Sequence, residues 1–475
     1  MTETDTETAV EAVIETVNPA TGEALASYPV MDDAAIEAAV TEVTEAARTW
    51  ASVRRADRSS LLVRIADSLD AQRESLAALI TSEMGKPLRE ARGEVDKSAT
   101  TARWYAANLA RLLEPQPVDV GGGARAWVTR EPIGPVLAVM PWNFPLWQVM
   151  RFVLPALGAG NTVLLKHSPN VTGSALAIES LVRGAGMEQE TPHGLLRTLV
   201  VAEAHVPEVS DRLVADPRVA GVTLTGSNRA GAAVGAAAGR AVKPSVLELG
   251  GSDAFVVLSD ADVAAAADAA VRARFHNGGQ SCVCAKRFIV AAEVADEFMD
   301  RFLLGVSALR VGDPTDESVD VGPLARDDLR TAVQRQVDES VTAGARLVAG
   351  GSAITGDGWF FEPTVLIVDG PGVPVFDEET FGPVAAVVVA RDDADAARLA
   401  DATAYGLGLS VWSASTERAV ALAARVTTGA VFVNAVVASD VRVPFGGTKQ
   451  SGYGRELGAE GMYAFMNQRT YWAAV

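Results

Sequence analysis

One of the two cysteines in this chain stands in a segment that suits a reactive thiol. Residues 275–282 read Phe-His-Asn-Gly-Gly-Gln-Ser-Cys and end at Cys282. The glycine pair permits backbone conformations closed to other residues, and a nucleophilic thiolate needs an accessible site beside main-chain N–H groups. A free cysteine more commonly packs as a small apolar residue. Cys282 is therefore a candidate nucleophile, and its neighbours must decide between the two roles.

A carboxylate and an amide could assist such a thiol. Glu248 lies between two leucines at the end of an apolar run. It could be a buried structural group or a general base whose pKa burial raises. Asn143 lies in the run Pro-Trp-Asn-Phe-Pro, where its amide could donate to a developing oxyanion or form an Asx turn. Beside a nucleophilic cysteine, the base becomes the favoured role for Glu248.

A glycine-containing turn is a candidate phosphate site. Residues 225–231 read Thr-Gly-Ser-Asn-Arg-Ala-Gly and join a predicted strand to a predicted helix. The start of a helix offers N–H groups to a pyrophosphate, and glycines let the backbone approach it. Because the run is not Gly-x-Gly-x-x-Gly, it is a weak signal by itself.

The surrounding elements alternate between helix and strand. Helical spacing predicts helices over residues 32–50, 58–84 and 88–113, and then an exposed strand at 118–130. Short apolar runs predict strands at 136–140, 162–165, 198–201, 222–225 and 255–258. A second alternating block begins near residue 260, with strands at 288–290, 365–368, 385–389 and 431–433. This alternation is typical of α/β proteins with doubly wound parallel sheets, in which ligands bind at the carboxyl ends of the strands.

Length, charge and cysteine content narrow the class of protein. A chain of 475 residues predicts two or three domains. The formal net charge of −19 argues against nucleic acid and anionic membrane as partners. Two cysteines and an acidic N-terminus without a signal-peptide pattern favour the cytoplasm, and residues 1–14 are expected to form a disordered tail. The four scattered histidines have no metal-ligand spacing, so no metal site is expected.

The motifs taken together resemble the aldehyde dehydrogenase superfamily over residues 17–471. The resemblance rests on Pro-Trp-Asn-Phe-Pro, Leu-Leu-Lys166, Thr-Gly-Ser, Glu-Leu-Gly-Gly, Phe-x-Asn-x-Gly-Gln-x-Cys, Glu379-Thr-Phe-Gly-Pro, and Pro444-Phe-Gly-Gly-x-Lys-x-Ser-Gly-x-Gly-Arg-Glu. These motifs occur in the order and at the spacing of the family. The resemblance implies a Rossmann-like dinucleotide-binding domain at 15–116 and 133–249, a catalytic thiol domain at 250–444, and an oligomerisation arm at 117–132 and 459–475. A homodimer or homotetramer is therefore expected.

The resemblance also assigns chemical roles. Cys282 would attack an aldehyde, the Asn143 amide and the Cys282 N–H would hold the oxyanion, and Glu248 would activate water to hydrolyse the thioester. The cofactor would contact Trp142, Lys166, Ser168, Gly226, Ser227, Gly231, Leu249, Glu379 and Phe381. Members restricted to NAD often carry a glutamate where this chain has Pro169. Because no carboxylate there opposes a 2′-phosphate, we expect NADP to be preferred over NAD.

Substrate-binding residues follow from similarity to bacterial succinate-semialdehyde dehydrogenases. Arg151 and Ser439 match positions that bind the substrate carboxylate in those enzymes, and Arg442 lies nearby in sequence. An arginine fork suits a carboxylate, although Arg151 could also form an interface or surface ion pair. His276 stands where many members have a second arginine. The expected substrate is succinate semialdehyde, and the alternative is a general enzyme for other semialdehydes or uncharged aldehydes.

Cys284 lies two residues beyond the candidate nucleophile. It could simply line the loop, as free cysteines often do. Some succinate-semialdehyde dehydrogenases have this Cys-x-Cys arrangement and lose activity when the pair oxidises. Cys284 is therefore a possible redox partner of Cys282.

Overall fold

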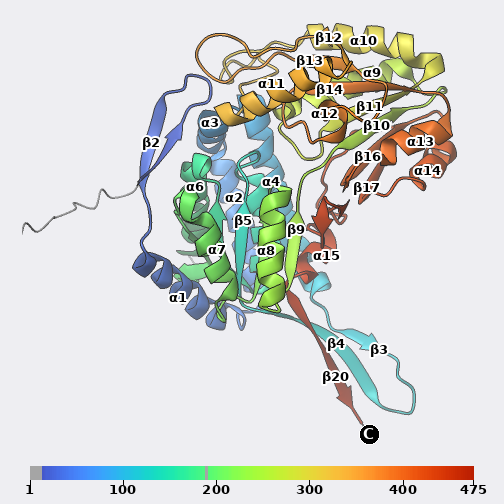
Figure 1. Cartoon of the computed structure of the whole chain (residues 1–475). Coiled ribbons are helices and arrows are strands. Elements are labelled where there is room, and N and C mark those ends of the chain that lie inside the picture. Colours follow the sequence, from blue (N-terminus) through green and yellow to red (C-terminus); the bar gives the residue numbers. More distant parts are fainter. Residues whose placement is uncertain (1–12, 188–190, 475) are drawn as a thin grey trace, which may run out of the picture.

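The computed structural model describes residues 13–187 and 191–474. Two α/β bodies, each built on a largely parallel sheet, lie one above the other in Figure 1, and a narrow β arm projects from the lower one. Within the described residues, no helix is long and apolar enough to cross a membrane. A short hairpin near the N-terminus flanks the lower body and comprises β1 (Val13–Val17) and β2 (Ala24–Pro29).

The lower body contains a six-stranded sheet in the order β19-β9-β8-β5-β6-β7. Its strands are β5 (Pro135–Met140), β6 (Thr162–His167), β7 (Leu196–Thr198), β8 (Gly221–Thr225), β9 (Ser245–Glu248) and β19 (Gly452–Tyr453). All neighbours are parallel except β19, which pairs antiparallel with β9. The chain moves outward from β5 to β7 and then returns to the other side of β5 with β8. The carboxyl ends of β5 and β8 therefore form the switch point where such sheets bind ligands.

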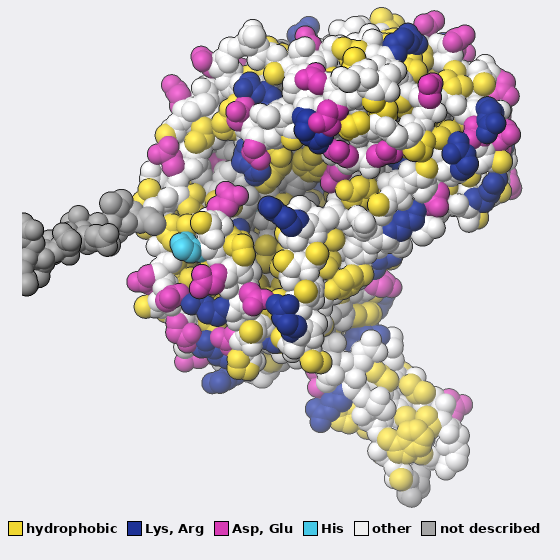
Figure 2. Space-filling view, viewed as in Figure 1, with side chains coloured by type: hydrophobic (Ala, Val, Ile, Leu, Met, Phe, Trp, Pro, Cys, Tyr) yellow, Lys and Arg dark blue, Asp and Glu magenta, His cyan; other side chains and the backbone are white. Residues whose placement is uncertain are grey.

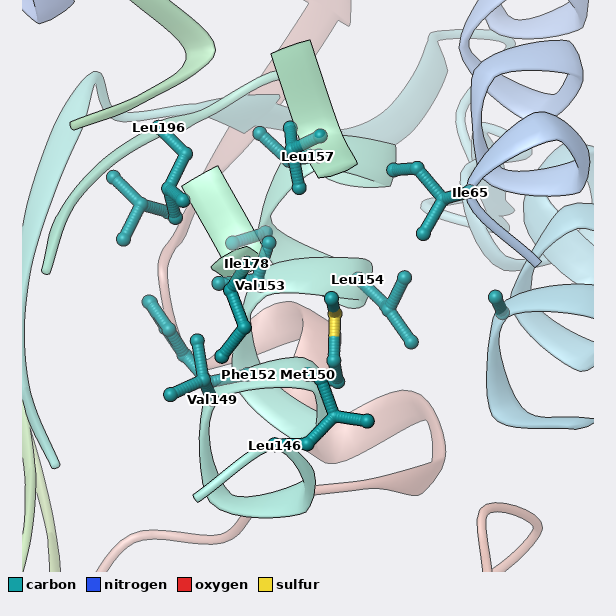
Figure 3. Packing of buried hydrophobic residues seen from close by; sticks show 14 of the residues in the cluster. Ile65, Leu146, Val149, Met150, Phe152, Val153, Leu154, Leu157, Ile178 and Leu196 are labelled. Atoms are coloured by element: carbon teal, nitrogen blue, oxygen red, sulfur yellow. The ribbon is translucent and has the colours of Figure 1, made fainter. Parts of the chain in front are cut away.

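Helices cover both faces of this sheet (Figure 1). They are α1 (Asp33–Trp50), α2 (Arg55–Ala71), α3 (Arg73–Met84), α4 (Leu88–Leu112), α5 (Trp147–Ala159), α6 (Thr172–Gly186), α7 (Val206–Ala215) and α8 (Asn228–Arg240). Every residue of α5 is buried, as expected for a helix that is apolar nearly all round. Figure 3 shows Met150 and Leu154 of α5 on the side of Ile65 of α2, and these residues belong to one buried cluster. This packing fixes the helix that follows Asn143.

The upper body contains a seven-stranded sheet in the order β12-β13-β14-β11-β10-β16-β17. Its strands are β10 (Asp253–Val257), β11 (Ala285–Ala291), β12 (Arg346–Ala349), β13 (Thr364–Ile367), β14 (Val384–Ala390), β16 (Gly408–Trp412) and β17 (Ala430–Val433). Only β12 runs antiparallel to its neighbour. The helices are α9 (Val263–Phe275), α10 (Ala295–Ser307), α11 (Asp327–Thr342), α12 (Pro374–Asp377), α13 (Asp393–Asp401) and α14 (Thr416–Ala423). A separate two-stranded antiparallel ribbon is formed by β15 (Tyr405–Gly406) and β18 (Thr448–Lys449). In the chain, β15 directly precedes β16 of the seven-stranded sheet.

The arm is a three-stranded antiparallel sheet of β3 (Gln116–Val118), β4 (Arg125–Pro132) and β20 (Met466–Ala473). The rings of Trp127 and Tyr471 stack across β4 and β20 with centroids 5.1 Å apart. Trp472 is 62% exposed, and Figure 2 shows hydrophobic side chains gathered near the end of the arm. Contact of this arm with another subunit stays a prediction.

Several sequence predictions need correction. The helix expected at 58–84 is two helices that meet at Gln72. The strand expected at 198–201 lies earlier, at β7, because the chain leaves this edge strand after Thr198. β9 and β16 were not predicted as strands. β1 begins at Val13, inside the expected tail, whereas residues 1–12 lie outside the described residues. α15 (Gly458–Tyr463) packs against α5, and β20 is the strand of the segment 459–475 that pairs with β4 of the arm. The domain boundaries themselves stay predictions.

Candidate active site

The backbone before Cys282 makes a tight left-handed turn. Asn277, Gly278 and Gly279 have φ values of 54°, 61° and 76°, a region that favours glycine and asparagine. A Cβ at Gly279 would collide with the carbonyl of Gly382. The glycines therefore have a conformational role. They let the chain reverse at the end of α9, so that Cys282 lies between the two sheets.

A buried lysine holds the thiol loop in place. Lys286, on β11, donates from Nζ to the carbonyl oxygens of Ser281 and Cys282, each at 2.8 Å. The same Nζ lies 3.7 Å from Oε1 of Glu379. These contacts tie the thiol loop to β11 of the upper sheet and place the Glu379 carboxylate beside the same ammonium.

Cys282 is half-buried against an apolar cluster. The cluster comprises Trp147, Leu407, Phe445 and Leu457, with Phe144, Val283 and Val441 packed against it. Burial raises the pKa of the Cys282 thiol to about 12, although Arg151 and Lys286 act in the opposite direction. In this state the sulfur is a protonated thiol, and its ionisation needs a base or a change in its surroundings.

Asn143 is bound to the thiol loop. Its Nδ2 donates to the carbonyl of Gln280 at 3.1 Å, and Asn277 Nδ2 donates to the Asn143 carbonyl at 2.9 Å. Asn143 is only 4% exposed, and its Oδ1 accepts from Gln148 at 3.4 Å. The structure thus brings the predicted oxyanion donor within two residues of Cys282. One Nδ2 hydrogen is used by the Gln280 carbonyl and the second is left for an oxyanion, so the oxyanion role of Asn143 stays a prediction.

Glu248 ends β9 and is 2% exposed. Its Oε1 is buried without a hydrogen-bond partner, and a Cβ at Gly446 would lie 2.6 Å from that oxygen. A buried unpartnered carboxylate oxygen is rare in native proteins and often marks a functional group. Burial, and then the nearby Glu456, raise the pKa of Glu248 well above 4.5, whereas Arg151 and Arg455 lower it. A carboxylate with a raised pKa suits a general base.

Arg151 does not stand free in the substrate pocket. Its guanidinium pairs with Glu456, donates to Thr225 Oγ1 at 3.1 Å and lies 5.1 Å from the Phe445 ring centroid. Arg151 is 2% and Glu456 4% exposed. A substrate carboxylate would have to compete with a buried carboxylate already in place. The role of Arg151 in substrate binding stays a prediction, and its observed partner is Glu456.

The residues predicted to bind a cofactor gather at the carboxyl edge of the six-stranded sheet. They follow β5 (Trp142), end or follow β6 (Lys166, Ser168), follow β8 (Gly226, Ser227) and follow β9 (Leu249). Ser227 caps α8, and its Oγ accepts from the Ala230 N–H at 3.3 Å. Gly231 has a packing role, because a Cβ there would collide with the Leu249 side chain.

Two further predicted cofactor residues arrive from the upper body. Glu379 accepts from the Gly251 N–H at 2.9 Å, and Phe381 meets Trp142 edge-to-face at 5.6 Å between centroids. On the face shown in Figure 2 the surface is hollowed between the two bodies. An extended dinucleotide lying along the sheet edge would therefore contact both bodies.

The remaining predicted substrate residues differ in placement. Half-exposed His276 lies 3.1 Å from Glu90 between Nδ1 and Oε1. Arg442 is exposed and pairs with Asp440 at 2.6 Å. Ser439 accepts from Lys97 Nζ at 2.6 Å, and Lys97 lies 4.4 Å from the Trp147 ring centroid. Ser439 is joined through Lys97 to the cluster around Cys282, and His276 through the Phe144 ring, whose centroid lies 6.1 Å from that of the imidazole.

Cys284 is buried, and its Sγ lies 3.6 Å from the carbonyl of His276. Burial raises the pKa of its thiol, although Arg274 and Lys286 oppose this. Both cysteines are free thiols. A redox role for Cys284 stays a prediction.

The comparison with family models decides the family. The model described as the aldehyde dehydrogenase family matches residues 5–471. The chain belongs to the aldehyde dehydrogenase family. The predicted fold class and the enzyme class, an oxidoreductase acting on aldehydes, are therefore confirmed for this aldehyde dehydrogenase.

Several proteins are similar to this chain over nearly their full length. A succinate-semialdehyde dehydrogenase (NADP(+)) of Mycobacterium avium is 44% identical over 462 residues, covering 97% of this chain and 96% of that protein. Succinate-semialdehyde dehydrogenase (NADP(+)) 1 of Mycobacterium tuberculosis strain H37Rv is 43% identical over 463 residues, 97% of this chain and 100% of that protein. The structure of succinic semialdehyde dehydrogenase from Streptococcus pyogenes with NADP+ superposes with a TM-score of 0.92 at 34% identity, covering 96% and 99% of the two chains. That of Gox0499 superposes with a TM-score of 0.93 at 39% identity, covering 97% and 99%.

Sequence reasoning missed three charged residues of this aldehyde dehydrogenase site: Lys97, Lys286 and Glu456. Glu456 stands inside a quoted motif, yet its partner Arg151 lies 305 positions earlier and nothing local connects them. Lys286 follows the thiol segment by four residues on an apolar strand, and a buried lysine in such a strand is a usable signal. Lys97 lies on a polar helix and resembles a solvated surface residue.

Proposed function

We propose that this aldehyde dehydrogenase oxidises succinate semialdehyde to succinate, with NADP as the preferred cofactor. The observation that carries the reaction type is the thiol loop: Cys282 is fixed between the two sheets with the Asn143 amide anchored to Gln280 beside it. The substrate is supported by relatives of 43–44% identity that bear the name succinate-semialdehyde dehydrogenase. The cytoplasm and a homo-oligomeric state stay predictions.

The first step forms a bond between sulfur and carbon. The Cys282 sulfur attacks the aldehyde carbon as a thiolate, after the thiol proton has passed to solvent. The carbonyl π electrons move onto oxygen, and the Asn143 Nδ2 and the Cys282 N–H stabilise that oxyanion. One such donor contributes about 3–4 kcal/mol to lowering the barrier. Because the loop is already hydrogen-bonded, little reorganisation accompanies the attack.

Oxidation and hydrolysis then release the acid. A cofactor held by residues such as Lys166, Ser168 and Glu379 would supply the hydride acceptor, and loss of the hydride would leave a thioester on Cys282. Glu248 takes a proton from water as the water oxygen attacks the thioester carbon. The carbon–sulfur bond breaks, succinate leaves, and the sulfur regains a proton. Burial and Glu456 raise the pKa of Glu248, whereas Arg151 and Arg455 lower it. Glu248 can therefore both accept and return the proton.

NADP is supported by the chain's own residues. Lys166 is 7% exposed, and burial lowers its pKa to about 8. Among the residues that the structure describes, no carboxylate forms an ion pair with Lys166, so a bound phosphate would compensate its buried charge. Pro169 follows Ser168 where a glutamate would exclude a 2′-phosphate. Lys166 and Ser168 are the residues that would hold this phosphate.

One observation favours the alternative, an enzyme for uncharged aldehydes: Arg151 is already neutralised by Glu456. The test is a panel of succinate semialdehyde, glutarate semialdehyde, butanal and benzaldehyde, each with NAD and NADP. We expect the highest kcat/KM for succinate semialdehyde with NADP. Comparable kcat/KM for butanal would refute the substrate, and a much higher kcat/KM with NAD would refute the cofactor preference.

A further inference from the structure

Lys97 of α4 faces the apolar cluster that contains the thiol. Its Nζ lies 4.4 Å from the Trp147 ring centroid and donates to Ser439 Oγ at 2.6 Å. Trp147 belongs to the same cluster as Cys282, and Val441, two residues beyond Ser439, packs on that cluster too. A cation and a hydroxyl therefore border the apolar surface on which Cys282 lies.

The charged groups around Lys97 leave its positive charge without an ion-pair partner among the described residues. The groups that act on it are Arg151 and Lys86, both cationic, and Asp440 and Glu94, both anionic. Each of these is already paired: Lys86 with Glu94, Arg151 with Glu456, and Arg442 with Asp440. Within the described residues no carboxylate forms an ion pair with Lys97, and its close polar partner is a neutral hydroxyl.

An unpaired, largely buried ammonium is costly unless an anion joins it. Burial, together with Arg151, lowers the pKa of Lys97 to about 8, so the side chain remains mostly protonated at neutral pH. An ammonium carries three donors, and Ser439 uses one. Two N–H donors and the rotatable hydroxyl of Ser439 remain for an incoming group.

We propose that Lys97 and Ser439 bind the carboxylate of the semialdehyde and so determine the substrate specificity of the enzyme. The aldehyde end then lies at Cys282, and the methylene chain lies against Trp147. This inference rests on the proposed function and deepens it, because it assigns the carboxylate to Lys97 in place of the ion-paired Arg151. Lys97 acts as a substrate-binding residue and takes no part in bond making.

The test compares Lys97→Met with wild type on succinate semialdehyde and on butanal, which has the same chain length without the carboxylate. Methionine keeps the apolar stem and removes the charge. A charge-assisted hydrogen bond corresponds to about 10-fold to 100-fold in kcat/KM. We expect kcat/KM for succinate semialdehyde to fall by that factor, mainly through KM, and kcat/KM for butanal to stay within about twofold.

Two matched variants complete the design. Lys97→Arg keeps the charge and should retain most of the activity on succinate semialdehyde. Arg111→Met removes one positive charge from the exposed end of the same helix and should leave both aldehydes unchanged. Butanal turnover also reports correct folding, so a misfolded variant is recognised as a loss on both substrates.

The outcomes separate the two claims. If wild type prefers succinate semialdehyde and Lys97→Met keeps that preference, Lys97 does not bind the carboxylate and the proposed function stands. If Lys97→Met and Lys97→Arg lose activity equally on both aldehydes, Lys97 is structural and the inference is wrong. If wild type shows no preference for the acid semialdehyde, the proposed function and the inference both fail.

Discussion

Replacing Arg151 by methionine separates a substrate role from a structural one. Arg151 and Glu456 are 2% and 4% exposed and form an ion pair, and Thr225 accepts a further hydrogen bond from the guanidinium. Removing one partner of a buried ion pair costs about 3–5 kcal/mol, because the other charge is left without compensation. Arg151→Met should therefore lower the free energy of unfolding by about 3–5 kcal/mol.

The same change should alter the pH dependence. Arg151 lowers the pKa of Glu248 and of Glu456, so its loss raises both further above 4.5. A folded-state pKa above the unfolded value means that the native state binds more protons. Stability therefore falls as pH rises from about 4.5 through the folded pKa, and this window widens in the variant. The acidic limb of kcat should likewise move to higher pH for every aldehyde.

The assay is urea unfolding of wild type, Arg151→Met, Glu456→Gln and the double variant at one protein concentration. The double variant leaves neither charge unpaired, so it should recover part of the stability lost in Arg151→Met. Stability unchanged within about 0.5 kcal/mol, together with a raised KM for succinate semialdehyde alone, would refute this reasoning. That result would restore Arg151 as the carboxylate-binding residue.

Three further predictions concern the thiol loop. Asn143→Ala should lower kcat by about 10²- to 10³-fold with both succinate semialdehyde and butanal in steady-state assays; an unchanged kcat would exclude Asn143 from the oxyanion site. In a Cys284→Ala background, the rate of Cys282 alkylation by iodoacetamide should rise about tenfold per pH unit from about pH 7 to about pH 10, because the pKa is raised to about 12. A plateau near neutral pH would show that the thiolate is already formed. Peroxide should inactivate the wild-type enzyme, and dithiothreitol should restore its activity, whereas Cys284→Ala should respond differently to the same treatment. Identical inactivation and recovery in both proteins would exclude the redox role.

The sequence predicted the parallel strands well because strands buried on both faces are short apolar runs bounded by helices. It missed the break between α2 and α3 because Gln72 is neither glycine nor proline and the apolar spacing continues across it. It missed β16, whose Gly408 and Ser410 interrupt the apolar pattern. In each case tertiary packing outweighed the local signal.

The candidate site divides in the same way. Cys282 and Asn143 belong to local motifs whose spacing indicates chemistry, and the structure brings them together. The pairing of Arg151 with Glu456 and of Lys97 with Ser439 joins residues more than 300 positions apart. No periodicity or motif encodes such contacts, because they depend on how α4, α5 and the C-terminal segment pack against one another.

The most direct test of the chemistry is to trap the acyl group on the enzyme. Glu248→Gln removes the base that activates water and leaves the attack by Cys282 possible. After this variant is mixed with succinate semialdehyde and NADP, mass spectrometry of digested protein should find a succinyl group on the peptide that contains Cys282, and one equivalent of NADPH should form in a burst. The same treatment of Cys282→Ser should give neither. Full steady-state turnover by Glu248→Gln, or a burst without an adduct on Cys282, would contradict hydrolysis of a Cys282 thioester by a Glu248-activated water.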